Sequence, residues 1–504
     1  MITPMRTLFV SRHEGKEINE PLGTQCLVRY VNQELKGLVS VEHSFDNLPD
    51  GEYEHVYISG CNNLGKIVEA YNKYTGAADL IMIGGSYATS YYSNVLKDCP
   101  KAICVIGEGE IAAYSIIKST IDGTSLESVP NIAFMRNEEL IQTPRKILDL
   151  GCIKHELDHE FLDQITRGVG LVRMETSRGC DHNKCTFCTI PQKYNGEKRR
   201  DFPIEIVRKE VIHLSSRGVK SICFTDEEFI GKDLRRAEGI VRMIDELKAN
   251  GLICKDMKFM ASVSVKLIKG KSKEHFETAK TLLRSMKKAG FDMLFVGIES
   301  GSKTQLKRYG KGVTPEDNED VLDFLKATDI CADIGFIMFD PLMSFSELEE
   351  NIEFVVRNGI HKTAARVIKK MIMIPGTAYE KMVRKKHGFL DEYGIAESST
   401  EIYIDPMVRA VLERISIDEL SCDDSYIIQS RKRMGLEDSS DDEKIKKYRE
   451  EEMQKLVEAV ESVKFKENTF SKTLEYYPIE ELNNTNCKHF VNSNTYLKRG
   501  AIYE

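Results

Sequence analysis

The segment Arg178-Gly179-Cys180-Asp181-His182-Asn183-Lys184-Cys185-Thr186-Phe187-Cys188 carries three cysteines in the spacing C-x4-C-x2-C. Three thiolates from one short loop suit an iron–sulfur cluster. A structural zinc ion would require a fourth ligand, and no Cys or His stands at a standard spacing just downstream. A cubane cluster held by only three cysteines keeps one iron free for an exchangeable ligand. The segment therefore predicts a cluster with an open coordination position.

The residues before the motif indicate where it lies in the fold. An apolar stretch from Val169 to Met174 runs into it like a buried strand. The cysteines are therefore expected at the C-terminal end of a strand, where a β/α barrel builds its active site.

The loop resembles the cluster-binding loop of the radical S-adenosylmethionine (SAM) enzymes, in which the residue before the last cysteine is usually aromatic, as Phe187 is here. The resemblance implies that Cys180, Cys185 and Cys188 hold a [4Fe–4S] cluster and that SAM chelates its fourth iron. The usual spacing in that family is C-x3-C-x2-C. This chain has one extra residue between the first two cysteines, so the loop must bulge. Zinc is the alternative reading of the cysteines alone.

Bulk properties narrow the class of protein. The 504 residues suggest about three domains, and 41% hydrophobic with 30% charged residues is typical of a globular protein with ample core. A net charge of -8 argues against nucleic acid as the main partner. No apolar run reaches the roughly 18 residues of a membrane span, and the N-terminus does not read as a signal peptide. Thirteen cysteines, scattered and odd in number, predict reduced thiols and a cytoplasmic location.

In residues 1–145, short apolar runs alternate with helix-length segments. This alternation predicts a doubly wound, Rossmann-like parallel sheet. Strands are expected at residues 7–10, 37–41, 55–59, 80–83 and 102–106, and helices at 65–74, 87–96 and 110–121. Such sheets bind ligands at the C-terminal ends of the strands. The candidate binding residues at those ends are Ser59, Gly60, Gly84, Gly85, Ser86, Gly107 and Glu108.

The order of these turns resembles the cobalamin-binding domain that precedes many radical SAM cores. The resemblance rests on Pro21-Leu22-Gly23, Gly84-Gly85-x-x-Ala88-Thr89 and Gly107-Glu108-Gly109-Glu110. It implies that these turns hold the nucleotide tail and corrin of cobalamin. The D-x-H-x-x-G loop of some cobalamin proteins is replaced by residues 11–15, which leaves His13 as either a lower ligand or a solvated side chain. A domain that no longer binds cobalamin is the alternative, and tight βα turns alone would also explain the glycines.

Residues 146–390 contain a connector, ending near residue 162, and six strand–helix units. They predict a partial (β/α)6 barrel, open enough for a bulky substrate and a second cofactor. The strands are expected at residues 171–176, 221–225, 258–262, 293–298, 333–338 and 367–373.

Acidic residues follow the second strand. Asp226, Glu227 and Glu228 would be costly to bury unless they met a cation, and the amino group of SAM is one. The resemblance implies that this segment binds that amino group. The alternative is a group of N-terminal acids that cap the next helix.

Later strand ends carry further matches to the family. Val296-Gly297-Ile298-Glu299-Ser300 resembles its G-x-E-S signature, so Glu299 would bind the ribose or amino group of SAM and Ser300 would support it. Pro375 and Gly376 resemble the segment along the adenine. The stretch from Lys307 to Gly312 also resembles the family, and its Lys311 would either touch the SAM carboxylate or be solvated. Asp340 could contact substrate.

The remaining polar residues of this part can also be explained without a functional role. Arg173 and Glu175 are either a structural pair or face substrate, and Lys198-Arg199-Arg200 reads as a solvated face. Residues 391–504 shift toward charge, and residues 445–463 show helical spacing of apolar positions. This region is expected to be a mostly helical domain that closes the mouth of the barrel and shapes the substrate pocket.

Together, the resemblances imply a cobalamin-dependent radical SAM methyltransferase that acts on an unactivated carbon. Such a C–H bond lacks acidity, so a 5′-deoxyadenosyl radical must take a hydrogen atom, and methylcobalamin then supplies the methyl group. The alternatives are a cyclising, rearranging or sulfur-inserting radical enzyme, and a protein that senses cobalamin or SAM. The expected partners are a small-molecule or peptide substrate and an external one-electron donor of the flavodoxin or ferredoxin type, with no nucleic acid and no membrane.

Overall fold

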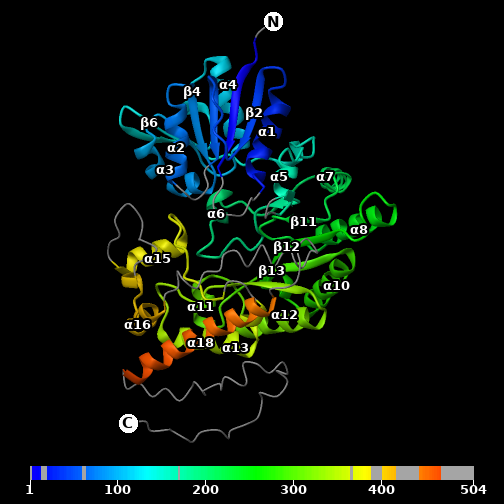
Figure 1. Ribbon diagram of the computed structural model, residues 1–504, viewed down its shortest axis with the longest axis vertical. Coiled ribbons are helices and arrows are strands. Elements are labelled where there is room, and N and C mark those ends of the chain that lie inside the picture. The colour runs from blue at the N-terminus through cyan, green and yellow to red at the C-terminus, as the bar shows by residue number, and fades with distance from the viewer. Residues whose placement is uncertain are drawn as a thin grey trace, which may run out of the picture.

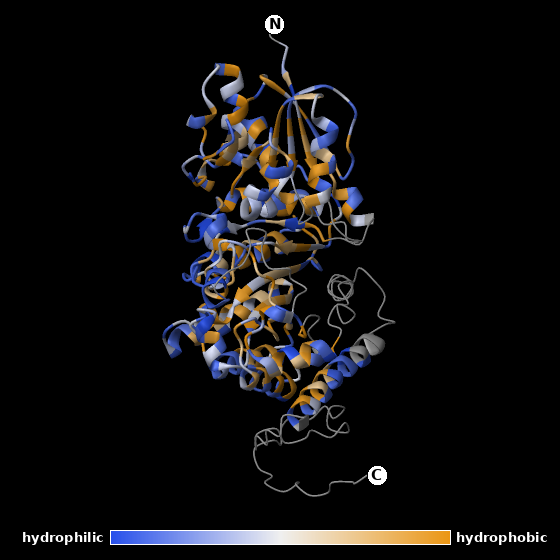
Figure 2. Cartoon of the chain, turned by 90° about the vertical axis from the view of Figure 1, so that its left-hand side faces the viewer, coloured by the Kyte–Doolittle hydropathy of each residue, from blue (hydrophilic) through white to orange (hydrophobic). Residues whose placement is uncertain are grey.

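The computed structural model describes residues 3–12, 20–59, 64–167, 171–363, 367–387, 400–415 and 442–466. Two α/β parts, one N-terminal and one central, are stacked along the long axis, with the C-terminal helices α16 and α18 beside the lower end of the central part (Figure 1). Apolar residues concentrate on the strands of the N-terminal sheet (Figure 2). No described helix combines the length and the apolar character that crossing a membrane requires.

The N-terminal part is a seven-stranded sheet in the order β2-β1-β3-β4-β5-β6-β7. Strands β1 to β5 pair in parallel, whereas β6 and β7 form an antiparallel hairpin at one edge. The strands are β1 (Met5–Ser11), β2 (Val39–Phe45), β3 (Tyr53–Ser59), β4 (Ala78–Gly84), β5 (Ile103–Val105), β6 (Ile132–Arg136) and β7 (Glu139–Gln142). The helices are α1 (Leu22–Glu34), α2 (Leu64–Tyr74), α3 (Ser86–Asp98) and α4 (Glu110–Asp122), followed by the short turn η1 (Leu126–Ser128).

The helices cover both faces of this sheet, as a doubly wound fold requires. Leu8, Val56 and Ile83 belong to one buried cluster, which includes residues of α2 and α3. Phe9, Tyr57 and Met82 belong to the other cluster, which includes residues of α1 and α4. Neighbouring residues of a strand thus alternate between two cores. The predicted α/β class and the five parallel strands are confirmed.

The central part is an open sheet in the order β14-β13-β12-β11-β8, with all strands parallel. Its strands are β8 (Arg173–Met174), β11 (Ser221–Phe224), β12 (Lys258–Ser264), β13 (Phe291–Glu299) and β14 (Cys331–Phe336). A two-stranded ribbon joins β9 (Ser177–Arg178) to β10 (Arg200–Asp201). The helices are α6 (Ile190–Lys193), α7 (Ile204–Ser216), α8 (Arg235–Ala249), α9 (Val265–Lys269), α10 (Lys273–Ala289), α11 (Lys303–Arg308), α12 (Pro315–Ala327), α13 (Phe345–Arg357), α14 (Ile360–Thr363) and α15 (Ala378–His387).

The sixth predicted strand is reduced to one bridge. Within the described residues, the segment expected at 367–373 pairs with the rest of the sheet only where Lys370 meets Phe339. Phe339 lies three residues beyond the end of β14, so only Phe339 and Lys370 come into register. Two backbone hydrogen bonds hold this bridge, from Phe339 N to Lys369 O and from Met371 N to Phe339 O. The expectation of six strands is corrected on this point, because the described sheet has five strands, and the sheet is open, as expected of a partial barrel.

The connector and the C-terminal helices complete the described chain. The connector holds η2 (Leu150–Cys152) and α5 (Leu162–Arg167), and the C-terminal region holds η3 (Thr400–Ile402), α16 (Pro406–Arg414) and α18 (Asp442–Lys466). Buried residues of α16 and α18, such as Val411 and Leu456, belong to the same core as the central sheet. Lys464 of α18 also pairs with Glu349 of α13. These helices pack beside α13 and α14, and the proposed closure of the barrel's mouth stays a prediction.

Candidate functional site

The three cysteines lie in the loop between β9 and α6, at the junction of the two α/β parts. The Gly179 backbone N–H donates to Glu227 Oε2 at 2.9 Å, which fixes the start of the loop to the end of β11. Asn183, within the longer spacing between the first two cysteines, has φ +44°. Positive φ is uncommon for a non-glycine residue, and Asn183 lies where the sequence predicted the bulge. The Asn183 side chain donates to Gly196 O at 2.9 Å, which holds the bulge in place.

The thiols are partly buried and influence one another. Burial raises the pKa of Cys185 to about 12, and the neighbouring Cys188 and Cys180 act in the same direction. Burial also raises the pKa of Cys180 and of Cys188. Among the described residues, no three His, Cys, Asp or Glu side chains are placed to hold a single metal ion. Three neighbouring thiols without a fourth ligand suit a cluster, because a structural zinc ion requires four ligands.

Lys311 and Glu299 form a buried ion pair beside these thiols. Lys311 Nζ lies 3.3 Å from Glu299 Oε1. Burial alone would lower the pKa of Lys311, but the charges of Glu299 and Cys185 raise it above its ordinary value. Glu299 has φ +67° at a bulge between β13 and β14. A non-glycine residue held there stores strain, which is a recurring property of binding sites.

The three acids after β11 have different partners. The Asp226 carboxylate accepts bonds from Thr176 N, Thr176 Oγ1 and Ser177 Oγ, and burial raises its pKa to about 6. Glu227 accepts from Tyr194 Oη at 2.6 Å and from Lys193 Nζ at 2.9 Å. Asp226 therefore holds the start of β9, whereas Glu227 links the first residue of the cysteine loop to the end of α6.

Glu228 differs from these two acids because one of its oxygens is free among the described residues. Glu228 Oε2 accepts from Gly231 N at 2.6 Å, whereas the buried Oε1 has no hydrogen-bond partner in the described part of the chain. Burial raises the pKa of Glu228 to about 7, and its charge acts on Cys180. A buried carboxylate oxygen next to a cluster ligand suits a cationic group of a bound molecule.

The other expected SAM residues surround the loop in different ways. The Ser300 hydroxyl is buried, and it lies 2.5 Å from Gln305 Oε1 and 2.8 Å from Asn351 Oδ1. Pro375 O accepts from Gln192 Nε2 at 2.9 Å, which places the Pro375-Gly376 turn against α6. The ring of Phe187 packs edge-on to that of Tyr309, with centroids 5.3 Å apart.

The turns of the N-terminal sheet face this loop. Gly107 has φ +78°, and a Cβ there would lie 2.5 Å from Lys193 O of α6. Only glycine allows this approach. Gly84 is equally confined, because a Cβ would lie 1.7 Å from Tyr57 Oη. Gly85 and Ser86 begin α3, and α3 contacts α6. Ser59 ends β3, whereas Gly60 and His13 lie outside the described residues.

Glu108 takes part in a buried contact between the two parts. Its Oε1 accepts from Arg178 Nη1 and from Arg200 Nη2, both at 3.0 Å. Arg178 also pairs with Glu110 and Glu175. The structure thus engages the Glu108 carboxylate with the central part, although the sequence placed it among the cobalamin contacts. Arg200, read as solvated from the sequence, belongs to the same buried set.

Several residues that hold the loop were not singled out from the sequence. Arg145, at the end of the N-terminal part, donates to Lys193 O at 3.1 Å, and the backbones of Tyr309 and Tyr379 bond Thr186 inside the loop. Tyr309 lies in the stretch that was matched to the family only as a whole. Their local sequence could not reveal these contacts, because the residues that they contact lie far along the chain.

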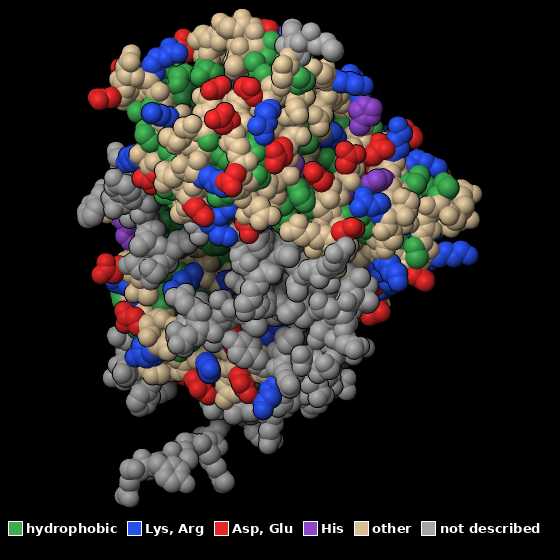
Figure 3. All heavy atoms as spheres, turned by 45° about the horizontal axis from the view of Figure 1, so that its top comes forward, with side chains coloured by type: hydrophobic (Ala, Val, Ile, Leu, Met, Phe, Trp, Pro, Cys, Tyr) green, Lys and Arg blue, Asp and Glu red, His purple; other side chains and the backbone are tan. Residues whose placement is uncertain are grey.

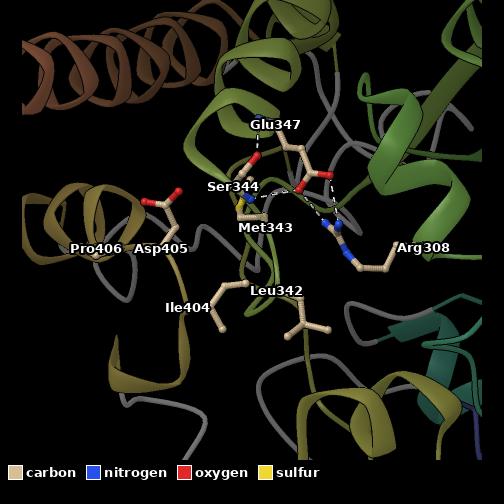
Figure 4. A pocket seen from close by; sticks show the side chains of 8 residues that line it. All are labelled: Arg308, Leu342, Met343, Ser344, Glu347, Ile404, Asp405 and Pro406. Atoms are coloured by element: carbon tan, nitrogen blue, oxygen red, sulfur yellow. Dashed lines mark hydrogen bonds and ion pairs between the residues drawn. The ribbon is translucent and has the colours of Figure 1, made fainter. Parts of the chain in front are cut away.

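Two cavities lie in other parts of the described structure. One of about 370 Å³ is lined by Arg308, Glu347 and the segments 342–344 and 404–406 (Figure 4). Its Arg308 guanidinium and Glu347 carboxylate pair at 2.8 Å. The other, of about 670 Å³, lies between α1, β2 and connector residues 154–160. On the face shown in Figure 3, acidic and basic side chains are interspersed.

Comparison with known proteins places this geometry in context. Residues 174–381 match the radical SAM superfamily. A 4′-phospho-dehydrooxetanocin synthase from Priestia megaterium is 30% identical over 321 residues, which cover 61% of this chain and 41% of that protein. This chain therefore spans less than half of that relative's length.

Two solved structures have a similar fold. The cobalamin-dependent S-adenosylmethionine radical enzyme OxsB with aqua-cobalamin bound has a TM-score of 0.75 at 20% identity, covering 92% of this chain and 73% of that chain. The radical S-adenosylmethionine methyltransferase TsrM from Kitasatospora setae, with cobalamin and a [4Fe–4S] cluster bound, has a TM-score of 0.61 at 14% identity, covering 91% and 100%. The similarity extends over both α/β parts.

Proposed function

We propose that the chain is a cobalamin-dependent radical SAM enzyme that methylates an unactivated carbon, and the match of residues 174–381 to the radical SAM superfamily is the starting point. The superfamily implies a [4Fe–4S] cluster and SAM. The further steps, to cobalamin and to methyl transfer, are supported by the N-terminal fold and by the geometry of the junction.

One observation carries the proposal. The turns at the C-terminal edge of the N-terminal sheet meet the two elements that flank the cysteine loop, with Gly107 against Lys193 O of α6 and Arg178 of β9 between Glu108 and Glu110. A ligand at this edge, where doubly wound sheets bind cofactors, would therefore be a neighbour of the cluster. Methyl transfer to a carbon radical requires that proximity.

The chain's own residues have distinct roles in this reading. Cys180, Cys185 and Cys188 hold the cluster, and the pair of Glu299 and Lys311 offers opposite charges to the amino acid part of SAM. Glu228 Oε1 adds a buried acceptor for a cationic group. When bound, these cofactors supply hydrogen-atom abstraction from substrate and a transferable methyl group. The buried carboxylates and apolar neighbours exclude water from the site.

A second reaction deserves a test because of the relative from Priestia megaterium. Its name describes a synthase and not a methyltransferase. A radical rearrangement or cyclisation, with cobalamin in a role other than methyl donor, is therefore the second candidate. An external one-electron donor and a small-molecule or peptide substrate belong to both proposals.

The test uses the anaerobically reconstituted full-length protein. We expect a visible spectrum with corrin and iron–sulfur bands, and SAM products that include both S-adenosylhomocysteine and 5′-deoxyadenosine. Cys185→Ala removes one cluster ligand and should abolish formation of 5′-deoxyadenosine. Cys254→Ala, which changes an exposed cysteine far from the motif in sequence, is the matched control and should leave it intact.

Three outcomes would contradict parts of the proposal. Deoxyadenosine without S-adenosylhomocysteine would favour the second reaction. A protein that carries zinc, or iron whose spectrum ignores added SAM, would end the radical SAM reading of this site. A reconstituted protein without corrin bands would remove the role of cobalamin alone.

A further inference from the structure

Asp340, just beyond the end of β14, is a buried carboxylate with five hydrogen-bond donors. It is inaccessible to solvent. Its Oδ2 accepts from Gln305 Nε2 at 2.6 Å, from Tyr309 Oη at 2.8 Å and from Arg308 Nη2 at 2.9 Å. Its Oδ1 accepts from Leu342 N at 2.8 Å and from Tyr379 Oη. The side chain is saturated by protein donors, so it has no capacity left for the substrate contact expected from the sequence.

The same donors hold the middle of the cysteine loop through their backbones. Thr186 stands between Cys185 and Phe187. Its N–H donates to Tyr309 O at 2.9 Å, and its C=O accepts from Tyr379 N at 2.8 Å. Its hydroxyl donates to Arg308 O at 3.0 Å. All three of these contacts of Thr186 therefore come from residues whose side chains converge on Asp340.

The negative charge of Asp340 has a counter-ion and helps to keep the two tyrosine donors protonated. Arg308 pairs with both Asp340 and Glu347, so the buried carboxylate has a counter-ion. Burial raises the pKa of Tyr309 and of Tyr379, and the charge of Asp340 adds to both shifts. Both phenols consequently remain protonated donors. Bonds between neutral donors and a buried carboxylate are among the stronger hydrogen bonds in proteins.

From these contacts we propose that Asp340 is the positioning residue of the cysteine loop. Asp340 fixes the positions of Tyr309 and Tyr379 through their hydroxyl groups. The backbones of these two tyrosines fix Thr186, and therefore also Cys185 and Cys188 on either side of it. The inference deepens the proposed function, on which it rests for the identity of the cluster. The contacts themselves are independent of which group the cysteines hold.

The experiment compares three variants of the full-length protein. Asp340→Asn keeps the side-chain shape but replaces one carboxylate oxygen with an NH2 group. The protein donors that bonded this oxygen then have no acceptor. Tyr379→Phe deletes a single bond to Asp340. Asp405→Asn is the matched control, because Asp405 lies in the same region but bonds Phe345 N and Met407 N and no residue of the loop. Asn also serves well as a helix N-cap, so α16 should be retained.

Two measurements read the loop directly. In metal-free protein, we expect the Thr186 amide to exchange with deuterium about tenfold faster or more in Asp340→Asn, with a smaller change of the same sign in Tyr379→Phe. In reconstituted protein, we expect the electron paramagnetic resonance spectrum of the reduced cluster to lose its response to SAM in Asp340→Asn. Asp405→Asn should match the wild type in both.

The inference is overturned if Asp340→Asn folds and keeps wild-type exchange and spectra, or if Asp405→Asn shows the same losses. Should Asp340→Asn fail to fold, Tyr379→Phe decides, and wild-type exchange at Thr186 in that variant would refute the inference. If the wild type itself forms no cluster, the proposed function fails, while the exchange measurement still tests the role of Asp340.

Discussion

Arg178 Nη1 lies 2.7 Å from Glu110 Oε1, across the boundary between the N-terminal and central parts. The same guanidinium lies 3.0 Å from both Glu108 and Glu175. One residue, two positions before the first cysteine of the motif, therefore compensates three carboxylates. The charges of these acids hold the pKa of Arg178 well above its ordinary value despite burial.

We expect Arg178→Ala to lower the free energy of unfolding by about 3–5 kcal/mol, because it leaves buried carboxylates without their counter-ion. Urea denaturation followed by circular dichroism measures the change. Arg136→Ala is the control: Arg136 pairs with Glu127 at the surface, and its loss should cost at most about 1 kcal/mol. Equal effects of the two substitutions would show that burial of the network contributes little.

Lys311 should tune the electron affinity of the cluster. Its positive charge acts on Cys185 and Cys180, and a nearby cation stabilises the reduced state. We expect Lys311→Met to lower the midpoint potential by on the order of 50 mV, with Glu299→Gln shifting it the opposite way. A redox titration without SAM measures both. Lys303→Met, at an exposed position of α11, should leave the potential unchanged; a shift of the same size there would contradict the assignment.

Gly84→Ala should destabilise the N-terminal part. The added methyl group would lie 1.7 Å from Tyr57 Oη, and Tyr57 is itself buried. We expect a loss of about 1–3 kcal/mol in thermal or chemical unfolding. Adding Tyr57→Phe should recover part of it, because the oxygen is removed but the ring carbon stays 2.6 Å away. Gly23→Ala in α1, where a Cβ meets nothing within 4 Å, should be neutral or slightly stabilising.

His159 should make stability depend on pH. It lies 2.5 Å from Glu20 and 3.4 Å from Glu210, and although burial alone would lower its pKa, these two carboxylates raise it to about 9. A histidine raised above its unfolded value of 6.5 stabilises the fold fully below that pH. This contribution is lost as the pH rises through about 9.

We therefore expect the free energy of unfolding to fall by on the order of 1–3 kcal/mol between pH 6.5 and 9.5 through this residue. Urea denaturation at several pH values measures it. His159→Gln should be less stable at pH 6.5 and should lose this part of the pH dependence. Parallel curves for the two proteins would exclude His159 as the source.

The parallel strands could be predicted because their signal is local. Leu8, Val56 and Ile83 stand in apolar runs bounded by polar segments, which is sufficient to place buried strands. The hairpin of β6 and β7 was missed because its turn, Asn137-Glu138, lacks glycine although both residues have positive φ. The sixth central strand was predicted from its apolar residues, but register with Phe339 limits it to one bridge.

The same difference between local and long-range signals applies to the candidate site. Cys180, Cys185 and Cys188 stand together in the sequence, so their spacing alone predicts a shared ligand. The role of Asp340 could not be read in this way, because its donors come from residues up to 39 positions away. Glu108 likewise meets Arg178 at a separation of 70 residues. A carboxylate at a strand end looks the same in the sequence whether it faces a cofactor or an arginine.

The turn at residues 107–110 touches both flanks of the cysteine loop, through Arg178 before it and Lys193 after it. A hinge opening between the N-terminal and central parts would separate Glu108 and Glu110 from Arg178 and leave both acids without this cation. Rigid-body swinging is therefore an expensive way to admit a large prosthetic group. If the proposed cobalamin binds here, we expect it to enter by local displacement of loops, or during folding, before the two parts pack against each other.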